Sequence, residues 1–149
     1  MQPSDIRLDT VQRTFRNYLE LLAEGYLVFG MSGVLSDHIE HSPMWASNFV
    51  ESLLVRIPPA TIWLRASKND TYTIVHGQRQ LRALQLFTQE KYALCSLEYL
   101  PEHEGATWSA LPHYLQRRIE DTIPIAYCIG AGVPDEVVAD ILYRIRGLS

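Results

Sequence analysis

The fold is decided by residues 72–84, whose sequence is YTIVHGQRQLRAL. The first half is rich in β-branched and aromatic residues, which is typical of a strand, and the second half has the leucine spacing of a helix. Gly77 lies between the halves, where glycine lets the backbone turn sharply and lets a ligand approach closely. We therefore predict a strand that ends before Gly77 and a helix over residues 78–88.

This junction is a candidate anion site. The first N–H groups of a helix have no partner inside the helix and lie at its positive dipole end. Arg79 and Arg82 stand in the first turns, where a guanidinium group can form two parallel hydrogen bonds to a phosphate. Strand–glycine–helix junctions are also common in α/β proteins, and helix arginines are usually solvated. A phosphate site and a plain structural turn are therefore both open interpretations.

Hydrophobic spacing and turn residues predict the other elements. Further helices are expected at residues 10–24, 42–56, 111–121 and 134–146. Strands are expected at residues 26–29, 61–65, 71–75, 92–99 and 123–129, with 61–65 and 71–75 forming a hairpin. The 149 residues are thus predicted to form a single mixed α/β (α+β) domain, with a small mixed sheet flanked by helices.

Composition narrows the classes of function. The net charge of −4 argues against tight, non-specific binding of duplex DNA, although it leaves room for a small basic pocket for one nucleotide. No 18-residue apolar run or secretory signal is present, so we predict a cytoplasmic protein without a membrane span. Cys95 and Cys128 each lie in an apolar run and are predicted to be buried free thiols.

The residues after the central strand resemble a known family. Residues 77–83, GQRQLRA, resemble the G-E-R-R-x-R-A box of ParB proteins and the D-G-Q-Q-R-L segment at the N-terminus of GmrSD-type restriction proteins. Three further segments fit the second family in order and spacing. They are residues 39–45 (IEHSPMW), residues 49–59 (FVESLLVRIPP) and residues 141–147 (ILYRIRG). The resemblance covers about residues 26–147.

The resemblance implies a compact ParB/sulfiredoxin-like fold. It also implies a domain that binds or hydrolyses a nucleoside triphosphate with Mg²⁺ in a bacterial or phage DNA-defence system, where a separate nuclease cuts DNA. The nucleotide or phosphate contacts that it implies come from Gly77, Gln78, Arg79, Gln80, Arg82 and Arg144.

Several polar positions depart from the family pattern. His76 replaces an aspartate, Glu40 and His41 replace a glutamine and an arginine, and Arg146 replaces an asparagine. The arginine at 79 is displaced by one residue, which rotates it by roughly 100° around the helix. We therefore expect a nucleotide-binding or regulatory module in which hydrolysis is weak or absent.

Two other functions stay open. An active nucleoside triphosphatase with a rebuilt site would use Glu40, His41 and His76 as candidate catalytic residues. A ligand-free protein-interaction domain would use the same fold without a site. His38 and His41 have a spacing that can bind zinc, but no third ligand is identified, so we predict no metal site. Any DNA cleavage is expected to need a nuclease on a partner chain or another domain.

Overall fold

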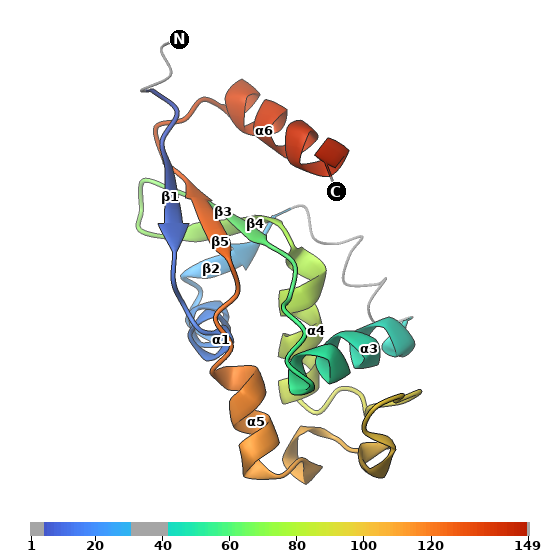
Figure 1. The fold of residues 1–149 in the computed structure, drawn as a ribbon. Helices are drawn as coiled ribbons and strands as arrows, with labels where there is room; N and C mark the ends of the chain where they lie inside the picture. Colours follow the sequence, from blue (N-terminus) through green and yellow to red (C-terminus); the bar gives the residue numbers. More distant parts are fainter. Residues whose placement is uncertain (1–4, 31–41, 149) are drawn as a thin grey trace.

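The computed structural model describes residues 5–30 and 42–148 (Figure 1). These residues form five α-helices and a five-stranded mixed sheet, which confirms the predicted mixed α+β class. The strands are Leu8–Val11 (β1), Leu27–Phe29 (β2), Ile62–Ala66 (β3), Tyr72–His76 (β4) and Ala126–Ile129 (β5). The helices are Phe15–Glu24 (α1), Pro43–Leu54 (α3), Gln78–Thr88 (α4), His113–Glu120 (α5) and Asp135–Leu148 (α6). Within the described residues, no helix combines the length and apolarity that crossing a membrane requires.

The sheet has the strand order β1-β5-β3-β4-β2. The predicted hairpin is confirmed, because β3 and β4 pair antiparallel with Leu64 opposite Ile74. β3 also pairs in parallel with β5, and β4 pairs in parallel with the edge strand β2. The hairpin therefore lies inside the sheet, and the helix that follows β4 begins near the middle of the molecule.

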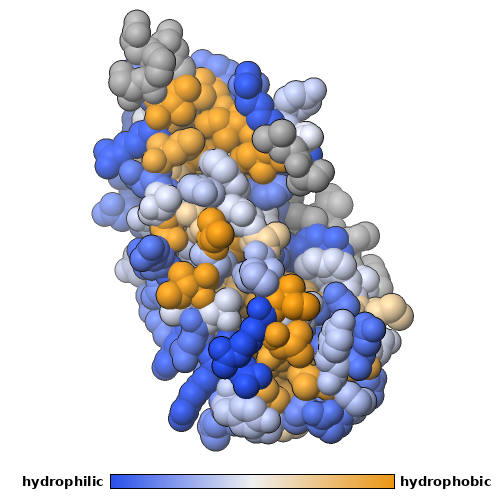
Figure 2. Space-filling view, in the orientation of Figure 1, coloured by the Kyte–Doolittle hydropathy of each residue, from blue (hydrophilic) through white to orange (hydrophobic). Residues whose placement is uncertain are grey.

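The two faces of the sheet are covered differently. Helices α1, α3, α4 and α5 bury one face in the main core, where Phe15, Ile74 and Leu84 are fully inaccessible. Side chains alternate along a strand, so Trp63 and Val75 point to the opposite face. There α6 packs on a smaller cluster around Ile129. Figure 1 shows α6 alone on that side, and apolar side chains remain visible over it in Figure 2.

The N-terminal region differs from the prediction of one helix over residues 10–24. Leu8–Val11 is an edge strand that pairs antiparallel with β5. The helix begins at Phe15, where the Thr14 side chain accepts a hydrogen bond from the Asn17 backbone N–H at 3.1 Å. The spacing of apolar residues is helical throughout residues 10–24. Pairing with the distant strand β5 nevertheless makes the residues up to Val11 a strand.

The strand predicted over residues 92–99 is wrong. This segment has no regular structure, and carboxylates take the place of a partner strand. Glu104 accepts hydrogen bonds from the backbone N–H groups of Ser96 and Leu97, at 2.9 and 3.0 Å. Glu51 does the same for the residues that follow. Both cysteines are free, as predicted, but only Cys128 is buried, and Cys95 is half-buried.

Candidate functional site

A cavity of about 520 Å³ lies at the N-terminal end of α4. Its walls come from α3, from the linker between α3 and β3, from the end of β4 and from the last turn of α6. This volume is within the range of small-molecule sites in proteins. The cavity thus coincides with the junction that the sequence singled out.

Gly77 shapes the floor of this cavity. β4 ends at His76 and α4 begins at Gln78, so the predicted junction is confirmed. Gly77 has a φ of 84°, and a Cβ atom there would lie 3.1 Å from the Thr61 carbonyl oxygen and 3.3 Å from Ile62 Cγ1. Only glycine combines this backbone conformation with such close packing. No side chain caps α4 at this position.

Arg79 is the most unusual residue of the site. Its guanidinium carbon lies 4.0 Å from the centre of the Trp45 ring, and Trp45 stacks on Phe49 with 5.8 Å between ring centroids. The Nε atom of Arg79 is buried and has no hydrogen-bond partner among the described residues. Burying a charged donor without a partner is unfavourable. This covered atom is out of reach of a ligand, so any contact from the cavity would go to the terminal nitrogens of the Arg79 guanidinium group.

His76 and Arg146 form a second polar corner of the cavity. They belong to β4 and α6, and both line the same space. Burial lowers the pKa of His76 below its ordinary value, and the positive charge of Arg146 lowers it further. His76 is therefore held mainly as the neutral imidazole near pH 7.

Arg144 does not line this cavity, in contrast to its predicted role. Its side chain is about three-quarters exposed, and its Nε donates a hydrogen bond to Asp140 at 2.9 Å. Two residues correspond to roughly 200° around a helix. The rotation therefore turns Arg144 away and brings Arg146, which was not among the predicted contacts, to the cavity.

No family model, curated protein or solved structure matches the chain. The resemblance to ParB and GmrSD-type proteins therefore stays a prediction.

The two predicted glutamine contacts line the cavity, but their polar atoms bind the scaffold. Gln78 Nε2 donates to the carbonyl oxygens of Gly30 and Ile74, each at 2.8 Å, and so joins β2 to β4. The amide of Gln80 forms two hydrogen bonds of 3.0 Å with the backbone of Ala60. Both side chains thus hold the cavity walls in place.

Arg82, the third member of the same helical segment, lies away from the cavity. Its guanidinium group bonds the Gln85 side chain on α4 and lies 5.9 Å from the Phe29 ring. It is not among the residues that line the cavity. Of the two arginines that the sequence singled out on this helix, the structure brings only Arg79 to the site.

Glu40 and His41, two of the three candidate catalytic residues, lie outside the described residues, as does His38. Among residues 5–30 and 42–148, no group of three or more histidine, cysteine or acidic side chains is placed to hold a metal ion. The described lining of the cavity offers arginines, amides and apolar groups but no carboxylate. It therefore suits phosphate oxygens, and any Mg²⁺ would arrive bound to those oxygens.

Sequence reasoning missed Trp45 and Arg146 as site residues. Trp45 belongs to a segment that resembles the family, but an aromatic side chain on an apolar helix is ordinarily assigned to the core. Arg146 stands where the family pattern has an asparagine, and it was therefore not among the expected contacts. The sequence alone could not assign Trp45 or Arg146 to the site, because that assignment requires knowing that α3 and α6 meet the same end of α4.

Proposed function

We propose that this chain binds the phosphate groups of a nucleoside triphosphate in the cavity at the start of α4, as a nucleotide-sensing or regulatory module. The observation that carries the proposal is a cavity at the N-terminus of α4 that Arg79 and Arg146 line and to which no described residue contributes a carboxylate. A phosphate there would accept hydrogen bonds from the first N–H groups of α4 and from the terminal nitrogens of the Arg79 guanidinium group.

The rest of the lining suits a nucleotide. Arg146 adds a second positive charge, and the described lining has no carboxylate to repel an anion. Trp45, Phe49 and the two prolines of the linker give the cavity an apolar wall against which a base can pack. The resemblance to GmrSD-type proteins supports the same ligand class and suggests a role in a DNA-defence system with a nuclease partner.

We expect hydrolysis to be weak or absent. Among the described residues of the cavity, only His76 could accept a proton from an attacking water, since its imidazole is mainly neutral near pH 7. No described carboxylate is available to hold Mg²⁺ or to assist His76. Phosphate release well above background, and abolished in His76→Ala, would instead favour an active triphosphatase.

The test is calorimetric titration of the full chain with ATP, GTP and CTP, with and without Mg²⁺. Arg79→Gln should weaken binding about tenfold or more, because a hydrogen bond to a charged group contributes roughly 1.5–3 kcal/mol. Arg144→Gln is the matched control, since it removes an arginine that does not line the cavity. The proposal is wrong if wild type binds no nucleotide at millimolar concentration, or if the two variants lose the same affinity.

A further inference from the structure

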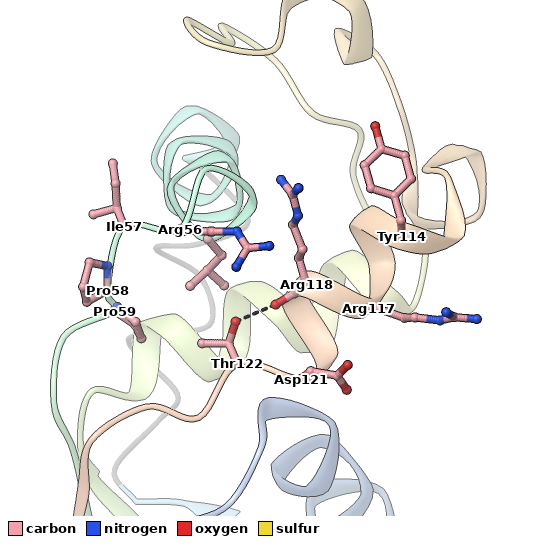
Figure 3. A pocket seen from close by; sticks show the side chains of 10 residues that line it. Arg56, Ile57, Pro58, Pro59, Tyr114, Arg117, Arg118, Asp121 and Thr122 are labelled. Atoms are coloured by element: carbon pink, nitrogen blue, oxygen red, sulfur yellow. Dashed lines mark hydrogen bonds between the residues drawn. The ribbon is translucent and has the colours of Figure 1, made fainter.

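A second cavity, of about 590 Å³, lies on the other side of the linker that follows α3. Leu53, Ile57, Pro58 and Pro59 line both cavities. The remaining walls come from Arg56, from α5 and from the two residues that follow α5 (Figure 3). The two cavities are thus neighbours, and one short stretch of linker separates them.

The second cavity is also rich in arginine. Figure 3 shows the guanidinium groups of Arg56 and Arg118 directed into the space between α3 and α5, with Arg117 pointing outward from α5. Arg118 is held in place, because its Nη1 donates to the Leu54 carbonyl oxygen at 3.0 Å and its Cζ lies 5.7 Å from the Tyr114 ring. A guanidinium group has five N–H donors, so most of those on Arg118 can still bind a ligand.

Arg56 has a backbone conformation that usually belongs to glycine. Helices α1, α3 and α4 end in the same way. A residue just after the helix adopts the left-handed conformation and donates its N–H to the carbonyl three residues earlier, and the next residue donates to the carbonyl five residues earlier. The left-handed residue is Gly25 after α1, Arg56 after α3 and Glu90 after α4. Side chains disfavour this conformation. Glu90 uses its carboxylate to accept a hydrogen bond from the Ser109 backbone N–H at 2.7 Å.

The Arg56 side chain has no comparable partner. It forms no hydrogen bond, ion pair or ring contact with the rest of the described chain, and it lines the cavity instead. Arg56 is exposed to solvent, so its guanidinium group is available to an anionic ligand in this cavity.

We infer that the second cavity binds the phosphodiester backbone of single-stranded nucleic acid. Five arginines and one aspartate line the two cavities, although the whole chain has a net charge of −4. Positive charge is therefore concentrated on either side of the linker. Tyr114, which is 58% exposed beside Arg118, offers a ring on which a base can stack, and stacking with arginine contacts is typical of single-strand binding.

Only one part of this inference rests on the proposed function. That part is the continuation of the nucleic-acid strand into the first cavity. A strand that placed one phosphate at the start of α4 would cross the linker and bring another between Arg56 and Arg118. The second cavity could hold a phosphodiester even if a mononucleotide did not bind at the first.

The test measures the affinity for a fluorescently labelled oligothymidylate of 12 nucleotides, by fluorescence anisotropy at several KCl concentrations. Arg56→Gly should weaken binding about three- to tenfold and reduce the slope of log K against log[KCl] by about 0.7, as expected for one lost phosphate contact to a single strand. The same variant should raise Tm by ~2–4 °C, because glycine relieves the left-handed backbone. A loss of binding in a more stable protein cannot be ascribed to unfolding. Arg144→Gln serves as the control for general loss of positive charge.

ATP titration of the same proteins separates this inference from the proposed function. Arg56→Gly should bind ATP as wild type does, whereas Arg79→Gln should not. Oligonucleotide binding that depends on Arg56 in a protein that binds no ATP would support the second site and refute the first. The inference is overturned if wild type binds no oligonucleotide, if Arg56→Gly leaves its affinity unchanged, or if Arg144→Gln weakens it equally. It is also overturned if inorganic triphosphate binds as tightly as the oligonucleotide, with the same dependence on Arg56, since the site would then take free polyphosphate.

Discussion

At the scale of single residues, Gly77 and Gly25 share one backbone conformation but differ in their surroundings. Their φ angles are 84° and 82°, yet a Cβ atom at Gly77 would press on β3 while one at Gly25 would meet nothing within 4 Å. The left-handed conformation alone costs a non-glycine residue about 1–2 kcal/mol. The contacts at Gly77 add a steric cost, so the strand–helix junction tolerates no side chain there.

We predict that Gly77→Ala lowers the free energy of unfolding by about 2–4 kcal/mol, against about 1 kcal/mol for Gly25→Ala. Urea denaturation of the two variants and wild type, monitored by far-UV circular dichroism, gives both values. The difference between the variants isolates the close packing of Gly77 on β3. Equal losses would show that β3 yields easily and that the junction is less tightly built than the distances indicate.

At the scale of elements, α3 organises the region around both cavities. One side of the helix presents Trp45 and Phe49 to the first cavity, and its end presents Arg56 to the second. Glu51, near the middle of α3, is only 2% exposed. Its carboxylate accepts hydrogen bonds of 2.7–3.1 Å from the backbone N–H groups of Glu98, Tyr99 and Leu100. One buried side chain thus fixes a loop that is distant in sequence.

Glu51→Gln should therefore destabilise the fold by about 2–4 kcal/mol, because an amide has one acceptor oxygen and leaves buried N–H groups without partners. Glu104 is the matched control. It also accepts two backbone N–H groups, but it is exposed, so water can replace it and Glu104→Gln should cost about 1 kcal/mol or less. Chemical denaturation measures both. A loss for Glu51→Gln no larger than that of the control would contradict the assigned role.

At the scale of the whole molecule, the first cavity joins parts of the chain that lie far apart in sequence. α6 crosses the face of the sheet opposite the main core (Figure 1) and brings Arg146 to the end of β4. The pKa of His76 is lowered first by burial and then by this arginine. Since the unfolded chain binds the proton more readily, the free energy of unfolding should fall as the pH drops below about 6.5.

Arg146→Gln should raise the pKa of His76 part of the way towards its ordinary value, leaving the effect of burial in place. A bound phosphate should raise it too, because a negative charge stabilises the imidazolium, so nucleotide binding should tighten as the pH falls below 7. NMR titration of the histidine ring in wild type, Arg146→Gln and Arg144→Gln measures the shift. A pKa of His76 that Arg146→Gln does not change would place α6 farther from β4 than described.

The sequence by itself determined the local elements and the junction between them. Two β-rich segments on either side of a polar turn predicted the β3–β4 hairpin, leucine spacing predicted α4, and the glycine before that helix predicted the turn at residue 77. These features depend on neighbouring residues and on φ and ψ preferences, so a short stretch of chain carries the information. The position of the candidate anion site could be named for the same reason, since it lies at the end of a helix that local spacing defines.

Only the tertiary structure decided which side chains meet. Residues 8–11 became a strand because β5 lies beside them, and residues 92–99 stayed irregular because Glu51 and Glu104 satisfy their backbone. Arg146 reaches the cavity in place of Arg144, and both glutamines of the central segment bind the scaffold. Spacing along one helix fixes the angle between its side chains but not the direction of the helix in the fold. That direction is set by packing between distant segments, which no local pattern encodes.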